Sequence, residues 1–337
     1  MTATAAPSAT AAPRPATGDV VVETTALTKR YGEFTALDSL SISLRRGQIL
    51  GFIGPNGAGK TTTIKILVGV MRPTSGSARI AGADCVRDAR RIKRLVGFMP
   101  DTFGAYDNMR VREYLDFFGA AFGIPRSSRG RRIAEVLETT GATSMQDLFV
   151  ESLSHGMRQR IGVARTLLHD PDVLILDEPA NGLDPQARIE MRELLLRLAR
   201  MGKTLIVTSH ILPELARICD VVAIITRGRL RAFGTLDQIM RDIRQQRTFE
   251  VQLCGGDQVA AAGEHVRRVL PEAERGGVAP LATERLVRFD TGLGDQELAG
   301  LLGGLVAAGI AVAQFREVPK DLEDAFLSVT RAEQQAT

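Results

Sequence analysis

The chain has 337 residues, of which 44% are hydrophobic and 24% are charged, a composition typical of a globular protein with room for two domains. Its net charge of +4 is small for this length and gives no reason to expect a nucleic-acid partner. The longest apolar runs are far shorter than the roughly 20 residues of a membrane-spanning helix, and the three widely spaced cysteines are expected to be reduced thiols.

The N-terminal part predicts a tail followed by strands. Residues 1–18 are rich in Ala, Pro and Thr and lack the apolar core of a signal peptide, so we expect a disordered tail. Val20–Val22 and the alternating Leu40–Leu44 predict strands. Between them we expect a turn at residues 28–32, where Tyr31 offers an aromatic ring that could stack on a base.

A glycine-rich segment follows the apolar run Ile49–Ile53, and it reads Gly54-Pro55-Asn56-Gly57-Ala58-Gly59-Lys60-Thr61 before a helical stretch that opens with Thr62. A strand, such a turn and a helix start form a phosphate-binding loop, because the backbone N–H groups converge on an anion. Lys60 can reach the β and γ phosphates, and Thr61 can bind Mg²⁺. The alternative is a chance glycine-rich turn, but the flanking strand and helix favour a nucleotide site.

Residues 88–170 predict mainly helices. Leu95–Met99 predicts a strand that ends shortly before Asp101, whereas Val111–Phe122 and Gly130–Thr140 have apolar residues at helical spacing that we assign to core packing. Ser154 is placed to cap the next helix.

Two acidic residues end a second buried strand. Val173–Leu176 is a continuous apolar run, and Asp177 and Glu178 follow it directly. Beside a triphosphate, Asp177 can hold Mg²⁺ through water, and Glu178 can polarise the water that attacks the γ phosphate. The same pair could instead be charges at a helix start, but its combination with the phosphate loop favours the catalytic reading.

The next elements bring a histidine to the same edge. Residues 181–185 predict a turn, residues 186–200 a helix, and Thr204–Ser209 a buried strand with His210 at its carboxyl end. Ligands of an open α/β sheet gather beyond the carboxyl ends of its strands, so we expect the loop, the acid pair and His210 to meet at one nucleotide. Residues 221–225 and 229–233 predict a hairpin.

The remaining chain predicts a second, smaller fold. Residues 236–246 form an expected linker helix, and strands at 249–253, 286–289 and 310–315 alternate with helices at 258–270 and 296–308. This order predicts a small α+β domain, ferredoxin-like if residues 278–281 add a fourth strand. We therefore expect a tail at 1–18, a nucleotide-binding domain at 19–240 with a helical subdomain at about 102–168, and an accessory domain at 241–337.

Taken in order, these motifs resemble those of the ATP-binding cassette (ABC) transporter ATPases. The resemblance covers about residues 20–240 and rests on five segments: the phosphate loop 54–61, a signature at 153–157, the acid strand 173–178, Leu183-Asp184, and His210. It implies an α/β P-loop NTPase core of the ABC type with ATP and Mg²⁺ as cofactors. The tail motif at 321–327 is similar to that of bacterial drug and polysaccharide exporters.

The resemblance also implies roles for single residues. Tyr31 corresponds to the residue that stacks on adenine, Glu178 to the general base, and His210 to the switch histidine. Thr62 belongs to the phosphate-binding segment. Nucleotide contacts across a dimer are implied for three further residues, Ser154, Gly156 and Asp184.

A working model of function follows from the family. Two copies pair head to tail with ATP between the loop of one and the signature of the other. Hydrolysis then drives separate transmembrane permease subunits at the cytoplasmic face of the membrane, in an exporter of the multidrug, antibiotic or lipid and polysaccharide type. The alternative is a soluble ABC-type switch on ribosomes or nucleic acid, although such proteins usually carry a second cassette, coiled-coil insertions or zinc cysteines. A small-molecule kinase would leave the signature unexplained.

Three residues depart from the family pattern. His155 and Met157 replace a glycine and the glutamine of the signature, while Ser154 and Gly156 are kept. Asp101 stands where the family has a glutamine that senses Mg²⁺ and the attacking water. An aspartate is shorter and charged, so we expect Asp101 beside the metal, where it could ligate the ion more tightly or alter the coupling to the membrane subunit.

Overall fold

The computed structural model describes residues 18–101, 108–209, 215–243 and 247–318. The chain divides into two compact units, Met1–Leu236 and Asp237–Thr337, close to the boundary expected between residues 240 and 241. Which function each unit has stays a prediction. The expected tail at 1–18, apart from its last residue, and the motif at 321–327 lie outside the described residues.

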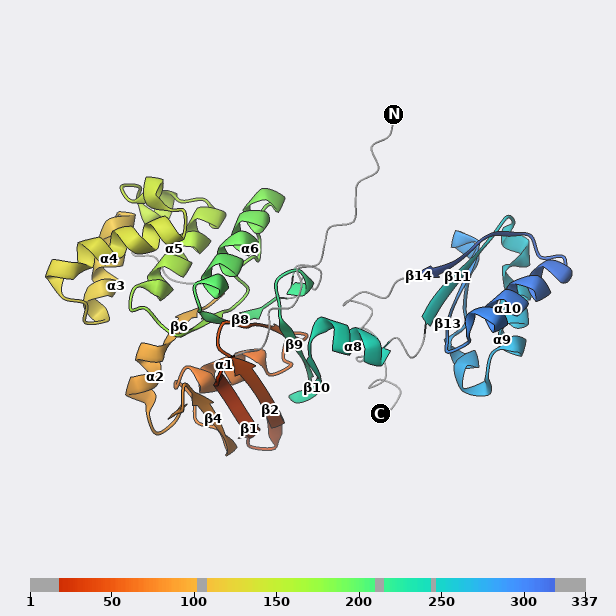
Figure 1. The fold of residues 1–337 in the computed structure, drawn as a ribbon, viewed down its shortest axis with the longest axis horizontal. Coiled ribbons are helices and arrows are strands. Elements are labelled where there is room, and N and C mark those ends of the chain that lie inside the picture. The colour runs from red at the N-terminus through yellow and green to blue at the C-terminus, as the bar shows by residue number, and fades with distance from the viewer. Residues whose placement is uncertain (1–17, 102–107, 210–214, 244–246, 319–337) are drawn as a thin grey trace. The chain divides into compact units, whose positions relative to one another are not determined.

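The first unit begins with a four-stranded antiparallel sheet in the order β2-β1-β4-β5 (Figure 1). Its strands are β1 (Val20–Tyr31), β2 (Phe34–Arg45), β4 (Ser75–Ile80) and β5 (Ala83–Asp84). From Leu40 to Leu44 buried and exposed side chains alternate, which confirms the predicted strand.

The turn predicted at residues 28–32 is wrong in position. Strand β1 continues to Tyr31, which pairs with Phe34, and only Gly32 and Glu33 connect the two strands. Ladder hydrogen bonds to β2 keep this stretch extended, and the reversal falls where Gly32 adopts a positive φ of 57°.

A six-stranded sheet forms the centre of this unit, in the order β10-β9-β3-β8-β7-β6. Its strands are β3 (Ile49–Ile53), β6 (Val96–Met99), β7 (Val173–Leu176), β8 (Thr204–Thr208), β9 (Val221–Thr226) and β10 (Arg229–Gly234). All neighbours are parallel except the hairpin β9–β10. Every residue of β3, β7, β8 and β9 is buried, as their continuous apolar runs predicted.

Helices cover both faces of this central sheet. The helices α1 (Lys60–Leu67) and α2 (Ala89–Leu95) share one apolar core with the antiparallel sheet and with strands of the central sheet. Helix α6 (Pro185–Arg200) packs against β8 from outside this core. The sheet is thus an inner layer, and only the ends of its strands are open to ligands.

A group of helices, yellow to green in Figure 1, follows β6. Its members are α3 (Val111–Ala121), α4 (Arg126–Thr139), α5 (His155–Leu167) and the short turns Thr143–Met145 and Val150–Ser152. Buried Tyr114 and Leu115 of α3 lie in this group, and α3, α4 and α5 contact one another. The predicted helices are confirmed, although α4 begins earlier, directly after Pro125.

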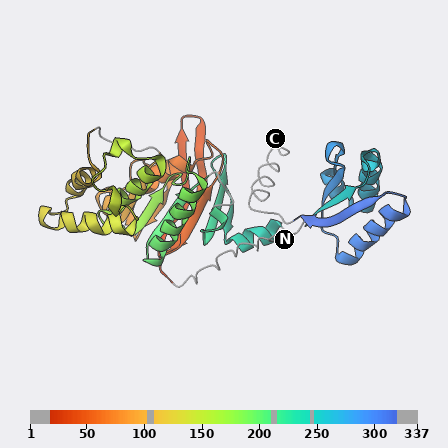
Figure 2. The same ribbon diagram turned by 90° about the horizontal axis from the view of Figure 1, so that it is seen from above.

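The second unit has the predicted βαββαβ order. After α8 (Leu236–Ile243) come β11 (Arg247–Leu253), α9 (Val259–Val269), β12 (Ala279–Leu281), β13 (Leu286–Thr291), α10 (Asp295–Ala307) and β14 (Val312–Val318), with short turns at Gly256–Gln258, Glu272–Gly277 and Ala282–Glu284. The sheet order β12-β13-β11-β14, all antiparallel, is that of a ferredoxin-like fold. Both α9 and α10 lie on one face (Figure 2).

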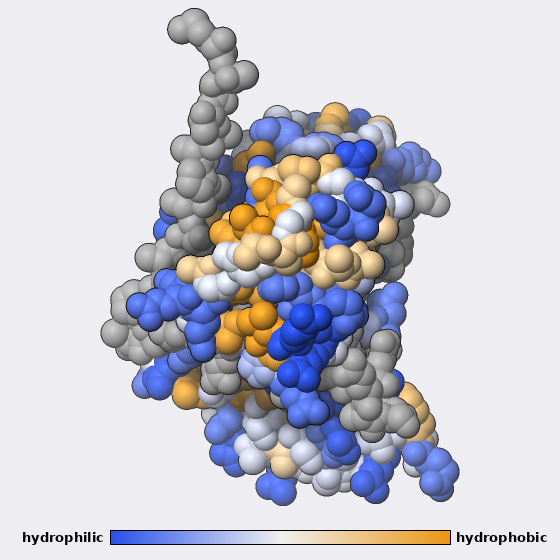
Figure 3. Space-filling view, turned by 90° about the vertical axis from the view of Figure 1, so that its right-hand side faces the viewer, coloured by the Kyte–Doolittle hydropathy of each residue, from blue (hydrophilic) through white to orange (hydrophobic). Residues whose placement is uncertain are grey.

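Apolar residues and glycines are exposed on the helices of the second unit. Val269 and Val306 are exposed, as are Gly300 and Gly303 on α10. Figure 3 shows one face of the protein, on which apolar surface is bordered by hydrophilic side chains. No helix within the described residues is both long and apolar enough for a bilayer crossing. All three cysteines are free thiols.

The helix-free face of the small sheet is held by one buried carboxylate. Glu250 lies between its register partners Arg288 and Arg316 on the flanking strands, with only 5% of its side chain exposed. Both arginines donate to it, at 2.5 and 2.7 Å. Burial alone would raise the pKa of Glu250, but these two hydrogen-bonded guanidinium groups outweigh burial and lower it.

We predict that Glu250→Gln lowers the stability of the second unit by about 1 kcal/mol at pH 7, because charge-assisted hydrogen bonds to half-exposed arginines are lost. Calorimetry of the full chain should show one transition shifted down by about 5 °C. Since the folded pKa is lowered, the carboxylate stabilises fully above the unfolded value of about 4.3, and the difference from wild type should be lost progressively as pH falls from that value through the lower folded pKa.

The matched control is Glu264→Gln, which removes an exposed carboxylate paired with Arg267 on α9. It should leave the transition within about 1 °C of wild type. Equal shifts in the two variants would contradict a special role for the buried Glu250.

Candidate functional site

The loop between β3 and α1 is built around glycines that no larger residue can replace. A Cβ at Gly54 would lie 2.4 Å from the carbonyl oxygen of Ile225. Gly59, the N-cap of α1, has a φ of 108°, and a Cβ there would lie 2.8 Å from the carbonyl oxygen of Ala36. The loop therefore turns tightly against β9 and β2 and opens its backbone toward solvent at the start of α1.

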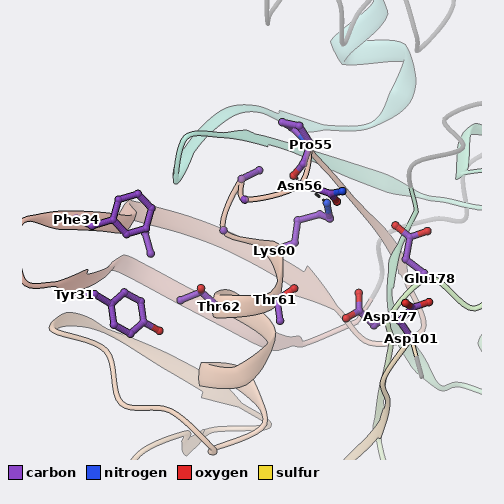
Figure 4. Close-up of a pocket in the computed structure, with 14 residues that line it drawn as sticks. Tyr31, Phe34, Pro55, Asn56, Lys60, Thr61, Thr62, Asp101, Asp177 and Glu178 are labelled. Atoms are coloured by element: carbon purple, nitrogen blue, oxygen red, sulfur yellow. Dashed lines mark hydrogen bonds between the residues drawn. The ribbon is translucent and has the colours of Figure 1, made fainter. Parts of the chain in front are cut away.

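Lys60, the first residue of α1, crosses this loop. Its Nζ donates to the carbonyl oxygens of Gly54 at 2.5 Å and Pro55 at 3.2 Å. Burial lowers the pKa of Lys60, and the nearby Glu178 and Asp177 oppose that effect. The lysine thus brings a partly desolvated positive charge between the loop and the acid pair (Figure 4).

The acid pair at the end of β7 is fixed by the neighbouring strand. Thr208, the last residue of β8, is completely buried, and its hydroxyl donates to Asp177 Oδ1 at 2.6 Å. The hydroxyl oxygen of Thr208 in turn accepts the backbone N–H of Glu178 at 2.9 Å. Glu178 has a positive φ of 52°, a conformation that non-glycine residues rarely adopt. Thr208 therefore holds both acids, and the sequence analysis did not single it out.

Sheet order sets the distance between the loop and the acids. Strand β8 lies between β3 and β7, so the two strands that carry the loop and the acids are separated by two strand spacings, about 10 Å. This gap leaves room for phosphate groups and a hydrated metal ion.

One pocket of about 340 Å³ joins most of the predicted residues (Figure 4). Its lining includes Tyr31, Phe34, Ala36, the loop and helix start from Pro55 to Thr62, Asp101, Asp177 and Glu178. Figure 4 shows the aromatic rings at one end, the acids at the other and the loop between them. An aromatic end and an acidic end separated by a phosphate loop fit a nucleoside triphosphate with its base at Tyr31 and its γ phosphate near Glu178.

The aromatic end has two rings where the sequence analysis named one. Tyr31 is 46% exposed, its hydroxyl donates to Met71 Sδ at 2.9 Å, and Lys29 Nζ lies 5.0 Å from its ring centre. Phe34, 65% exposed, is its partner across the hairpin. The sequence signal for Phe34 is its position directly after the two-residue turn Gly32–Glu33. It was missed because the turn was predicted at residues 28–32.

The acidic end of the pocket offers separate oxygen-bearing side chains rather than a ligand cluster. Groups of three or more His, Cys, Asp or Glu side chains that could hold a metal do not occur among the described residues. Thr61, Asp177 and Asp101 all face the pocket. This set suits Mg²⁺, which usually keeps several waters and takes one or two carboxylates together with substrate phosphates.

Three predicted binding residues do not line this pocket. Ser154 caps α5 by accepting the N–H of Met157 at 3.3 Å, and Asp184 caps α6 by accepting the N–H of Ala187 at 2.9 Å. Gly156 lies beside Ala187, where an added Cβ would be 3.3 Å from its Cβ. Within one chain these residues form helix starts outside the pocket. His210 lies outside the described residues.

Comparison with known proteins places this site in a family. A family model described as ABC transporter matches residues 37–181. Over 328 residues the chain is 37% identical to the Nod factor export ATP-binding protein I of Ralstonia nicotianae, a match that covers 95% of this chain and 97% of that protein. The chain belongs to the ABC transporter family. It is also 41% identical over 234 residues to the bacitracin transport ATP-binding protein BcrA of Bacillus licheniformis, covering 69% of this chain and 75% of BcrA.

A solved structure of an ATP binding subunit of an ABC transporter matches the fold. It aligns with a TM-score of 0.60 and 30% identity over 66% of this chain and 93% of its own. The expected P-loop NTPase core of the ABC type is therefore confirmed. This ABC protein is an ATPase, and it binds its nucleotide through the cassette.

We predict that Lys60→Ala weakens ATP binding about 10- to 100-fold, because charge-assisted hydrogen bonds to phosphate are lost. Isothermal titration calorimetry with ATP measures the change. The matched control is Lys65→Ala, an exposed lysine on the same helix, which should bind ATP as wild type does. Unchanged binding by the Lys60 variant would contradict the phosphate-loop assignment.

We also predict that Thr208→Val lowers kcat for ATP hydrolysis about 10- to 100-fold while the Kd for ATP stays within about twofold. Valine keeps the buried volume but removes the hydroxyl that holds Asp177 and the Glu178 backbone. Thr208→Ser should restore most of the rate. If serine and valine were equally slow, packing and not the hydroxyl would be the cause.

Proposed function

We propose that this ABC ATPase powers a membrane exporter, acting as a head-to-tail pair of identical subunits bound to separate transmembrane permease subunits at the cytoplasmic face. In this proposal residues 19–240 are the ATP-binding domain, with a helical subdomain at about 102–168, and residues 241–337 are an accessory domain. The observation that carries the ATPase part of the proposal is the pocket lined by both the phosphate loop and the acid pair.

The pocket assigns a chemical role to each side. Lys60 and the loop N–H groups bind the phosphates, Tyr31 stacks on the base, and Glu178 accepts a proton from the attacking water. Thr61, Asp177 and Asp101 would hold Mg²⁺, which supplies charge neutralisation on the phosphates when bound. His210 is proposed as the switch residue at the γ phosphate.

The position of the signature supports a pair of subunits. Ser154, Gly156 and Asp184 lie outside the pocket of their own chain, at the positive ends of α5 and α6. We assign these helix starts to the ATP that a second copy holds. Neither pocket then has a full set of phosphate donors alone, so ATP joins the two copies.

A second hollow supports a permease partner. It has a volume of about 760 Å³, and the apolar side chains along it include Val70, Phe98 and Phe122, while Arg90, Lys93, Arg94 and Arg165 supply positive charge. Among the residues that the structure describes, its lining contains neither Asp nor Glu. A permease segment with apolar and acidic side chains fits this hollow.

This hollow borders the nucleotide site through adjacent residues of the chain. Pro100 lines the hollow, and Asp101 lines the pocket. A movement at one site therefore reaches the other through one peptide bond.

The proposal that the protein serves an exporter is based on the names of similar proteins. The two similar proteins carry the names Nod factor export and bacitracin transport, which favour export over a soluble switch on ribosomes or nucleic acid. The cargo is expected to be selected by the permease.

We predict that Glu178→Gln binds ATP, hydrolyses it at least 100-fold more slowly and accumulates as a dimer with Mg·ATP, because the general base is lost while binding remains. Size-exclusion chromatography measures the dimer. Tagged Glu178→Gln purified from native membranes with Mg·ATP should carry a stoichiometric polytopic membrane protein.

Two controls sharpen this experiment. Glu193→Gln, an exposed glutamate on α6, should hydrolyse ATP normally and not accumulate as a dimer. Adding Arg90→Glu and Arg94→Glu to the trapped variant should release the membrane protein and leave the dimer intact. Wild-type hydrolysis by Glu178→Gln would refute the general-base role. Recovery of ribosomes without a membrane protein would refute the exporter.

A further inference from the structure

One of the departures from the family signature makes a specific contact. His155, the first residue of α5, points its Nε2 at the backbone carbonyl oxygen of Asn181, 2.8 Å away. A carbonyl oxygen can only accept, so Nε2 carries the hydrogen and donates. A Cβ at Gly182 would lie 3.4 Å from the same nitrogen. The imidazole therefore lies directly over the segment that follows the acid pair.

That segment is connected to both sides of the nucleotide site. The N–H of Asn181 donates to the carbonyl oxygen of Glu178 at 3.1 Å, and its side-chain Nδ2 donates to Asp101 Oδ1 at 3.4 Å. Three residues later, Asp184 caps α6. The carbonyl that His155 holds thus belongs to the residue that bonds both Glu178 and Asp101.

We propose that His155 is a positioning residue that ties the start of α5 to residues 179–184 and, through Asn181, to Asp101 at the metal end of the pocket. This inference rests on the proposed function, in which the start of α5 binds the ATP of the second copy. It adds a route within one chain. The ATP held by the second copy, bound at the start of α5, would act through His155 and Asn181 on the metal end of this chain's own pocket. Glycine, the family residue at this position, has no side chain and cannot form this route.

The contact suits this role better than a purely structural one. His155 is exposed, so it contributes little to the core, and α5 already has Ser154 as its N-cap. The helix can therefore form without the imidazole. The imidazole instead contacts the loop, whose backbone hydrogen bonds, Asn181 N–H to Glu178 and Leu183 N–H to Ala180, are internal and do not connect it to α5.

The first test is hydrogen–deuterium exchange of the nucleotide-free full chain. In His155→Ala, amides of residues 180–184 should exchange about fivefold faster, the factor that one ordinary hydrogen bond is worth. Amides of α5 beyond its first turn should be unchanged. His155→Gln, whose amide can donate to the same carbonyl, should restore slow exchange, and His155→Gly should behave as His155→Ala does.

The second test separates the metal end from the phosphate loop. In His155→Ala, the Mg²⁺ concentration for half-maximal ATPase activity should rise about fivefold, whereas the Kd for ATP without Mg²⁺ should equal that of wild type. Asn181→Ala should raise the Mg²⁺ requirement similarly, and the double variant should add little, because both residues act on Asp101 in series. His265→Ala, which removes a histidine from the second unit, is the control and should behave as wild type in both tests.

The outcomes distinguish the inference from the function it rests on. Unchanged loop exchange, failure of glutamine to rescue, or additive effects of His155→Ala and Asn181→Ala would overturn the positioning role. Faster exchange along all of α5 would also overturn it, because His155 would then stabilise the helix itself. Absence of Mg²⁺-dependent hydrolysis in the wild-type chain would refute the proposed function, while the exchange test would still report on the contact.

Discussion

The constraint on which this site depends is the position of β8 between β3 and β7. Parallel pairing on both sides of β8 fixes the separation of the phosphate loop and the acid pair at two strand spacings, about 10 Å. The same strand ends in Thr208, whose hydroxyl bonds both acids. A single buried strand therefore sets the width of the site and the orientation of its acidic wall, and neither quantity depends on the flexible side chains that face the ligand.

Outside this centre, contacts run through short chain segments. Asp177 donates its N–H to Met99 at 2.8 Å, and the residues after Met99 are Pro100 in the basic hollow and Asp101 in the pocket. Asn181 then connects Asp101 to His155 and so to α5. The basic hollow, the acidic end of the pocket and the start of α5 therefore lie within a few bonded contacts of one another, which gives the proposed coupling of hydrolysis to movement a physical basis.

Local sequence signals predicted much of this architecture. Continuous apolar runs revealed β3, β7, β8 and β9, glycines revealed the phosphate loop, and the order of elements gave the ferredoxin-like unit. Pairing between strands that are distant in the chain is not encoded locally, which is why Thr208 was missed. The turn before Phe34 was misplaced for a different reason, because the ladder to β2 keeps β1 extended as far as Tyr31. The signature was recognised as a motif, yet a linear pattern does not reveal that Ser154 and Asp184 do not line their own pocket or that His155 contacts Asn181.

The backbone of Glu178 has a consequence for protein engineering. A glutamate with a φ of 52° is held in a conformation that costs roughly 1 kcal/mol relative to glycine, so the least comfortable backbone position of the acidic wall coincides with its proposed general base. Glycine at this position would relieve that strain and remove the proposed general base at the same time. Relief of backbone strain and the proposed catalytic role are thus opposed at Glu178, so a more thermostable variant has to gain its stability at other positions.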